Sequence, residues 1–389
     1  MRDRAHPITA DERRARIERA RRLMTDQKID ALLLTGGTSA IYFSGARLGG
    51  SERISAIVLT ARGDGFCVCP AFEEERLREQ FAAGPLASSQ LLVWQEDESP
   101  FALIAKGLRD RGVSTGRVGV EETVKFVFTD SLASAAPALH LTSATAVTAG
   151  CRMIKDDHEI ALIRLASQAT LRCYEAVFHA LTPGMTETEV RSLISAAYAQ
   201  VGFTGSASVQ VGEYTALPHG SLAPQTIREG TIIMIDDGCV VEGYQSDITR
   251  TFVLGKATDA MKKVFDIVQR AQAAAVRAAR PGVALESIDR AGRTVIVDAG
   301  YGPGFKYFTH RLGHGLGMDM HEWPYLVKNN MFGWDRNLTA QPGMVFSDEP
   351  GIYIPGAFGV RLEDDMVITS AGAELLTPPS ASIENPFAA

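Results

Sequence analysis

A chain of 389 residues is longer than one ordinary hydrophobic core accommodates, so we expect two domains. Its composition of 46% hydrophobic and 22% charged residues is that of an ordinary globular enzyme. The net charge of −7 argues against a nucleic-acid partner, which usually meets a basic face, and no run of about 18 apolar residues is present to span a membrane.

The first 150 residues alternate helical and strand patterns and contain no obvious cluster of reactive side chains. The predicted elements are, in chain order, a helix over 10–27, a buried strand over 31–34, a hairpin of strands 54–60 and 66–69, helices near 72–83 and 99–112, and a strand over 117–120. This order predicts a small α/β domain over residues 1–150.

The five cysteines are odd in number and scattered, which fits a reducing compartment better than a disulfide framework. Cys67 and Cys69 are explained by alternation along a strand. The charged N-terminal residues 1–5 lack the apolar segment of a signal peptide. We therefore expect a cytoplasmic protein.

The pattern changes near residue 151, where long helical segments begin. A helix is predicted over 156–181, and Thr186-Glu187-Thr188-Glu189 is a capping box that opens the next one. Two further helices are predicted near 258–280 and 284–299. We expect a second domain over residues 151–389, and every candidate catalytic residue lies in it.

Two predicted hairpins in this domain carry acidic residues inside apolar strands. The first covers residues 232–252 with Asp236 and Asp247, and the second covers 344–365 with Glu349 and Glu363. Side chains on paired antiparallel strands can share one face, so each pair of acids can meet. Since each hairpin is accompanied by a pair of helices, the two form a weak internal repeat that would give a pseudo-symmetric sheet.

His314, flanked by two glycines, lies between the hairpins and completes a metal-binding set. Burying carboxylates is costly unless positive charge compensates them, and four carboxylates balance two divalent cations. Asp, Glu and His suit Mn²⁺, Co²⁺ or Zn²⁺, and two such ions can share a water and lower its pKa. The sequence therefore predicts a dinuclear metal hydrolase. Its predicted ligands are Asp236, Asp247, His314, Glu349 and Glu363.

Three more histidines, His219, His310 and His321, lie near these acids in the sequence. Any one alone is more typical of a surface or a structural histidine. Their clustering with His314 suggests imidazoles that polarise a carbonyl or stabilise a tetrahedral oxyanion.

The motifs resemble those of the pita-bread metallopeptidases, which include methionine aminopeptidase, Xaa-Pro aminopeptidase and Xaa-Pro dipeptidase (prolidase). The signatures, in the family's order, are Asp236-Asp237-Gly238, Gly243-Tyr244-Gln245-Ser246-Asp247-Ile248-Thr249-Arg250-Thr251, Gly313-His314-Gly315, Glu349-Pro350-Gly351 and Gly359-Val360-Arg361-Leu362-Glu363-Asp364. The N-terminal domain is similar to that of the creatinase, prolidase and aminopeptidase P branch. The resemblance implies an α/β two-domain fold with a creatinase-like N-terminal domain, an α+β pita-bread catalytic domain with a pseudo-twofold sheet, and a homodimer.

The resemblance also implies roles for individual residues. Two divalent ions, with Mn²⁺ first and Co²⁺ or Zn²⁺ as alternatives, would be bridged by Asp247 and Glu363. Glu349 would carry a proton from the metal-bridging hydroxide to the leaving nitrogen. His219 and His321 would contact the scissile carbonyl and the intermediate, with His310 as a further catalytic candidate. Arg361 would pair with a ligating acid and orient it, at the substrate pocket.

The implied reaction is hydrolysis of Xaa-Pro bonds, preferentially in dipeptides. A dipeptidase needs a cation for the substrate's C-terminal carboxylate. Some family members place an Arg directly after the His-Glu-Trp-Pro run, where this chain has Tyr325, and others place one at the position of Asp335, beside Arg336. We therefore expect Tyr325, Arg336 and Arg361 to contribute to substrate binding.

Other functions share the same scaffold. An Xaa-Pro aminopeptidase for longer peptides would use the same metal ligands, and a hydrolase of small non-peptide amides is a second alternative. An interaction module without activity is disfavoured because all five ligands are present.

Overall fold

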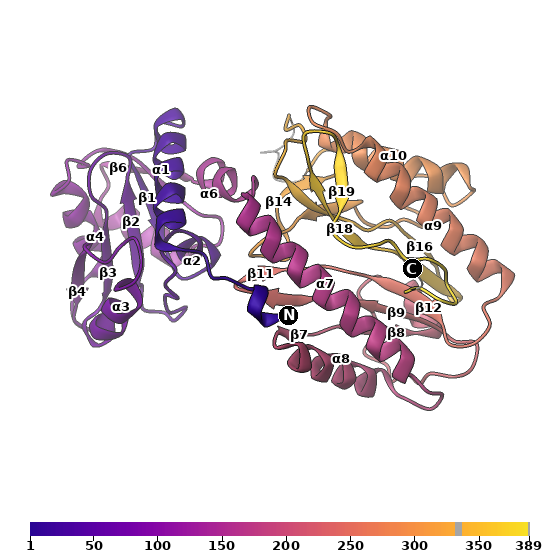
Figure 1. Cartoon of the computed structure of the whole chain (residues 1–389). Helices are drawn as coiled ribbons and strands as arrows, with labels where there is room; N and C mark the ends of the chain where they lie inside the picture. The colour runs from indigo at the N-terminus through magenta and orange to yellow at the C-terminus, as the bar shows by residue number, and fades with distance from the viewer. Residues whose placement is uncertain (331–336, 388–389) are drawn as a thin grey trace. The chain divides into compact units, whose positions relative to one another are not determined.

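The computed structural model describes residues 1–330 and 337–387, which divide into two compact units (Figure 1). One unit is Pro7–Arg152, and the other is Met153–Ala389 together with Met1–His6. The first six residues thus differ from the expected N-terminal domain, because their contacts are with the second unit: Arg4 bonds to Gln168, and His158 Nε2 lies 3.0 Å from the His6 carbonyl. None of the helices in the described ranges combines the length and the apolar character that a membrane span requires.

The unit Pro7–Arg152 is a six-stranded mixed sheet with helices, in the strand order β4-β3-β2-β1-β5-β6. Its strands are β1 Ala31–Leu34, β2 Ala56–Thr60, β3 Phe66–Pro70, β4 Gln90–Trp94, β5 Gly116–Val120 and β6 Leu139–Ser143. Its helices are α1 Ala10–Asp26, α2 Thr38–Ser44, α3 Glu74–Phe81, α4 Pro100–Arg109, α5 Phe126–Ala135 and α6 Thr145–Arg152. The edge strands β4 and β6 were not predicted. Their side chains are largely half-buried or exposed, so they lack the continuous apolar burial of the central strands.

The second unit contains two halves, each with a helix pair and antiparallel strands (Figure 1). The first half consists of α7 Asp157–Ala180, α8 Glu187–Val201, β7 Thr204–Gly205, β8 Ser208–Val211, β9 Ile232–Asp236, β10 Cys239–Val241, β11 Tyr244–Gln245 and β12 Arg250–Val253. The predicted capping box at Thr186 is present: its side chain accepts from Glu189 N, and the Glu189 side chain accepts from Thr186 N.

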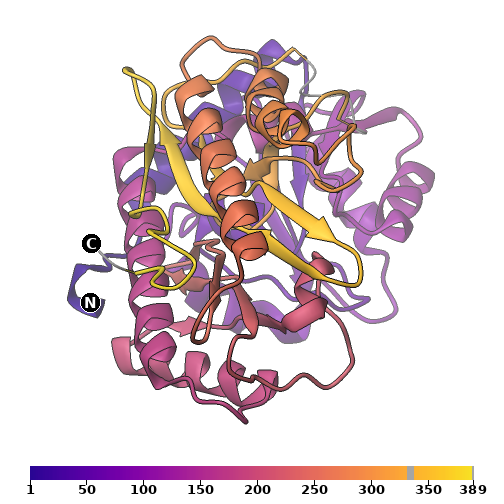
Figure 2. The same ribbon diagram turned by 90° about the vertical axis from the view of Figure 1, so that its right-hand side faces the viewer.

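The second half repeats this plan with α9 and α10, which lie in front of its strands in Figure 2. Its elements are α9 Asp259–Ala278, α10 Leu285–Asp298, β13 Gly313–Gly315, β14 Glu322–Leu326, β15 Val345–Asp348, β16 Gly351–Ile354, β17 Phe358–Arg361, β18 Asp364–Ile368 and β19 Ala373–Leu375. Residues such as Val268, Ile288, Phe346 and Val360 form one fully buried core between these helices and strands. Burial of this apolar surface is the main contribution to the stability of the second half.

Neither acid-bearing strand pair is an unbroken hairpin. In the second, β15 pairs with β18 and β16 with β17, and the ladder is interrupted at residues 349–350 and 362–363. Pro350 has no N–H to donate to a ladder. In the first, β9 pairs with β12 and β10 with β11, and the break is at Asp237, whose φ is +106°. These interruptions matter because the candidate metal ligands lie at them or beside them.

Candidate metal centre

The strand register of the second hairpin brings its predicted pair of acids to one face. In the second hairpin Asp348 pairs with Asp364 and Gly351 with Arg361, so the register places Glu349 opposite Glu363. In the first hairpin, Ile235 pairs with Arg250, and Asp236 is the last residue of β9. The acids thus lie at the interrupted parts of the ladders or directly beside them.

Three overlapping groups of side chains could each hold a metal ion. In each group, one possible ligand atom per residue lies within 4.8 Å of those of the others. The groups are Asp236, Asp247 and Glu363; His314, Glu349 and Glu363; and Asp247, His314 and His321. Together they contain all five predicted ligands and add His321. Asp247 and Glu363, which the family resemblance implied as bridges, each belong to two groups.

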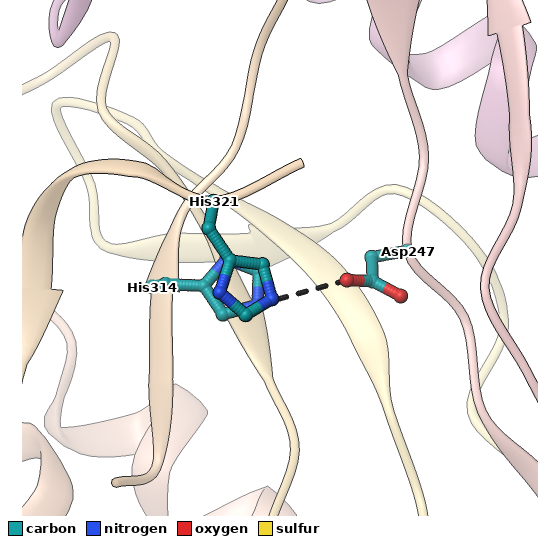
Figure 3. A group of neighbouring side chains, drawn as sticks. All are labelled: Asp247, His314 and His321. Atoms are coloured by element: carbon teal, nitrogen blue, oxygen red, sulfur yellow. Dashed lines mark ion pairs between the residues drawn. The ribbon is translucent and has the colours of Figure 1, made fainter. Parts of the chain in front are cut away.

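His314 is held with one ring nitrogen toward the acids. Its Nδ1 lies 3.1 Å from the Gly315 carbonyl, which can only accept, so Nδ1 carries the hydrogen. Burial lowers the pKa of His314 well below its usual range, so the ring is neutral and Nε2 is unprotonated. Nε2 lies 3.6 Å from Asp247 Oδ2 and 3.4 Å from Glu349 Oε1. A Cβ on Gly313 would lie 2.0 Å from the Ser347 carbonyl oxygen, so this strand can approach β15 only with glycine there. Figure 3 shows the His314 ring facing Asp247.

The predicted residue Arg361 binds a candidate ligand directly. Its guanidinium donates to Asp236, and Nε lies 3.0 Å from Thr249 Oγ1. Thr249 Oγ1 in turn lies 2.6 Å from a carboxylate oxygen of Asp236 and 2.6 Å from one of Glu363. Arg361 also donates to the Tyr353 hydroxyl at 2.9 Å. These contacts show Arg361 orienting an acid; contact with a substrate stays a prediction.

Among the described residues, Arg361 forms ion pairs with Asp236 and Glu363 and so balances only part of the charge of the acids. Burial, followed by repulsion from neighbouring carboxylates, raises the pKa of Asp247 and Glu363 well above the usual range, and burial raises the pKa of Glu349 to about 8. Burial opposes ionisation of Asp236 too, but Arg361 and Thr249 together lower its pKa. The single hydrogen of the Thr249 hydroxyl can satisfy only one of its two carboxylate neighbours. An all-oxygen and imidazole donor set with this excess of negative charge fits divalent metal ions.

The two histidines that the ligand groups do not include differ in their surroundings. His310 Nδ1 donates to the Arg311 carbonyl at 2.8 Å, and Nε2 lies 2.7 Å from the Tyr353 hydroxyl. Burial lowers the pKa of His310 to about 3, so the ring is neutral. The Tyr353 hydroxyl thus links His310 to Arg361, which binds Asp236. His219 is exposed on the loop that follows the short helix Gly212–Ala216.

A cavity of about 590 Å³ contains the candidate ligands and most of the other predicted residues. Its lining includes His219, Asp236, Asp247, His310, Arg311, His314, Met320, His321, Val327, Glu349, Arg361 and Glu363. Tyr325 is not among the described residues that line it; its ring lies 4.8 Å from Trp323 and beneath the Arg311 guanidinium at 4.1 Å. Arg336 lies outside the described residues.

Sequence reasoning missed Arg311, Thr249 and Tyr353. Thr249 stands inside the recognised motif around Asp247, and Arg311 directly follows His310, so proximity to the motifs was the available signal. Tyr353 carried no such signal, because its role depends on the pairing of β16 with β17, which places it near Arg361.

Two sequence profiles match the chain. The profile of Metallopeptidase family M24 matches residues 161–370, and that of the Creatinase/Prolidase N-terminal domain matches residues 16–154. The chain belongs to metallopeptidase family M24. The family expected from the motifs is thereby confirmed, and membership implies divalent metal ions.

Relatives of this M24 chain are similar over nearly their whole length. "Probable dipeptidase PepE" of Mycobacterium bovis is 36% identical over 351 residues, which is 90% of each chain. The crystal structure of dipeptidase PepE from Mycobacterium ulcerans has a TM-score of 0.89 at 32% identity, covering 97% of this chain and 99% of that one. The Xaa-Pro dipeptidase from Bacillus anthracis has a TM-score of 0.80 at 30% identity, covering 94% and 98%. These matches confirm the predicted fold class and show that the M24 chain is a metallopeptidase.

Proposed function

We propose that this M24 chain is a dinuclear metal-dependent exopeptidase that hydrolyses Xaa-Pro bonds, with dipeptides as its preferred substrates. The observation that carries the proposal is the convergence of four carboxylates and the unprotonated Nε2 of His314 on one cavity. The dipeptidase and Xaa-Pro dipeptidase names of similar proteins support the substrate class.

Asp236, Asp247, His314, Glu349 and Glu363 would hold two divalent ions, with Mn²⁺ as the first candidate and Co²⁺ or Zn²⁺ as alternatives. When bound, such ions lower the pKa of a water and polarise the scissile carbonyl.

Glu349 would move a proton. Its Oε1 lies 3.4 Å from the Ser347 hydroxyl, and its Oε2 lies 3.6 Å from His310 Nδ1. The carboxylate lines the cavity, so it can take a proton from the attacking water and give it to the leaving imino nitrogen of proline. The substrate's free amine would lie beside Asp236.

His219 and His321 would orient the substrate's carbonyl. His219 and His321 are exposed and line the same cavity, so each can offer an N–H to a carbonyl oxygen that gains negative charge during attack. His310 would act through Tyr353 and Arg361 by holding Asp236. A cavity of about 590 Å³ is of the size that encloses a small ligand.

Two further properties belong to this proposal. The cysteines Cys67, Cys69, Cys151, Cys173 and Cys239 are unpaired and buried. Unpaired cysteines support the proposal that the protein functions in the reducing cytoplasm.

Exposed Phe72, Phe126 and Val127 on the N-terminal unit support a homodimer, because exposed apolar side chains often mark protein interfaces. Light scattering of the purified chain would give the mass of a monomer if the dimer is wrong.

The test compares metal-free protein with and without added Mn²⁺ on Ala-Pro and Ala-Pro-Ala. Cleavage of the dipeptide alone, restored by the ion, is the expected result. Efficient cleavage of the tripeptide would assign the chain to the aminopeptidases instead. Cleavage of neither peptide by metal-loaded protein would exclude proline peptides and favour a small-amide substrate.

A further inference from the structure

The position of His321 allows two different roles. One of its ring nitrogens belongs to the group with ligand atoms of Asp247 and His314, which would suit a sixth metal ligand. Figure 3 shows the His321 ring stacked on that of His314, and their centroids are 3.8 Å apart with an interplanar angle of 24°. The alternative role is to donate a hydrogen bond to the substrate. Nδ1 of His321 is in contact with Arg311, which leaves Nε2 for either role. At Nε2 the two roles need opposite tautomers of the imidazole, because a nitrogen that carries a hydrogen cannot bind a metal.

Arg311 decides between these tautomers. Its Nη2 lies 3.3 Å from His321 Nδ1. A guanidinium has five N–H donors and no acceptor, so Nδ1 must accept in this contact. A neutral imidazole whose Nδ1 accepts carries its hydrogen on Nε2. His314, stacked against it, has the opposite arrangement, since its Nδ1 donates to the Gly315 carbonyl and its Nε2 is unprotonated.

The Arg311 guanidinium is itself held by an aromatic platform. Its Cζ lies 4.1 Å from the centre of the Tyr325 ring, a distance at which a cation and an aromatic face attract each other. Tyr325 packs against Trp323 in β14, the strand that begins directly after His321. Strand pairing aligns Tyr325 with His314 on β13, so the platform and both histidines are fixed by one pair of strands.

We propose that Arg311 is a positioning residue that fixes neutral His321 with its hydrogen on Nε2. His321 is thereby a hydrogen-bond donor toward the substrate and not a metal ligand, while His314 is the imidazole that binds metal. Tyr325 supports Arg311 and does not touch the substrate's carboxylate. The tautomer follows from the contact with Arg311 alone; the donation to a substrate rests on the proposed function.

The direct test is the ¹⁵N spectrum of the His321 ring in the whole chain, assigned by comparison with His321→Ala, first metal-free and then loaded with Zn²⁺. The expected result is a hydrogen on Nε2 in both states and a direct metal signature on His314 alone. A hydrogen on Nδ1 of His321, or loss of the Nε2 hydrogen on zinc loading, would overturn the proposal.

Two variants of Arg311 test the same point through function. Arg311→Lys keeps a group that only donates, whereas Arg311→Glu offers one that only accepts and should move the hydrogen of His321 to Nδ1. We expect the Glu variant to have a kcat/KM on Ala-Pro about 100-fold below that of the Lys variant, as for loss of one donor to a developing oxyanion. Because Glu also changes the local charge, the pair is repeated in a His321→Ala background, where the difference should shrink to a few-fold.

An undiminished difference in the His321→Ala background would mean that Arg311 acts through charge and not through His321. If the Glu variant does not fold, the spectra of the wild-type chain and of Arg311→Lys still decide, since both must show the hydrogen on Nε2. Absence of Ala-Pro cleavage by the wild-type chain would overturn the proposed function and leave the tautomer to the spectra.

Discussion

Replacing Arg250 by alanine should destabilise the catalytic unit strongly, because it breaks an ion pair that no solvent reaches. The side chains of Arg250 and Asp364 are both 0% exposed, and Arg250 Nη2 lies 2.7 Å from Asp364 Oδ1. Arg250 also donates to the backbone carbonyls of Glu363 at 2.8 Å, of Thr249 at 3.0 Å and of Pro378 at 2.8 Å. The change therefore removes one partner of a buried pair and the donor to three carbonyls.

The size of the destabilisation depends on the interactions that Asp364 keeps in the Arg250→Ala variant. Breaking a buried ion pair costs about 3–5 kcal/mol. Asp364 keeps hydrogen bonds from Thr377 at 2.7 Å and Gln272 at 3.0 Å, and burial raises its pKa, so the orphaned carboxyl can take up a proton. The free energy of unfolding should thus fall by about 3 kcal/mol. For a unit of this size that corresponds to a melting temperature lower by roughly 6–12 °C.

Calorimetry is the suitable assay, because the two compact units can unfold in separate transitions. Only the transition of the unit that contains Arg250 should move to a lower temperature. The matched control is Lys262→Ala, which breaks an ion pair of 2.9 Å whose side chains are 42% and 39% exposed and should cost less than about 1 kcal/mol. The double variant Arg250→Met with Asp364→Leu should recover part of the loss. Equal, small losses for Arg250→Ala and Lys262→Ala would refute the reasoning.

Three other outcomes are expected. Glu349→Ala and His314→Ala should each abolish Ala-Pro turnover while the circular dichroism spectrum stays that of the wild type; full activity of either would contradict the mechanism. Gly313→Ala should lower the melting temperature, since the added Cβ would lie 2.0 Å from the Ser347 carbonyl oxygen, and an unchanged melting curve would show that the strands can separate at no cost. In metal-free protein, burial raises the pKa of Glu349 to about 8, so the folded state binds more protons than the unfolded state, and stability should fall as pH rises from about 4.5 to 8. Urea unfolding at several pH values would check this, and Mn²⁺ should weaken the dependence; stability that rises over this range without metal would contradict the sign.

The candidate metal site could be predicted from sequence because its residues break a strong local rule. Asp236 directly follows the apolar run Ile232–Ile235, and a compensating charge explains an acid there. The spacing within each hairpin then limited which side chains could meet. The interruption of the first ladder was not predicted, because it lies at Asp237, whose positive φ is uncommon for a residue other than glycine.

The surroundings of the site could not be predicted in the same way. Arg311 follows His310 in the sequence, but its contact with His321 depends on the pairing of β13 with β14, which no local pattern predicts. Arg361 was recognised as a partner of an acid. Its hydrogen bond to Tyr353, which in turn contacts His310, joins residues that are far apart in the sequence. Such long-range contacts follow from packing and not from a local pattern.

Titration of metal-free protein with Mn²⁺, in which both the bound ions per chain and the rate of Ala-Pro hydrolysis are followed, tests the proposed two-metal mechanism. We expect no turnover without metal and a rate that reaches its plateau when two ions are bound. A plateau at one ion per chain, or full turnover in the presence of a chelator, would contradict it.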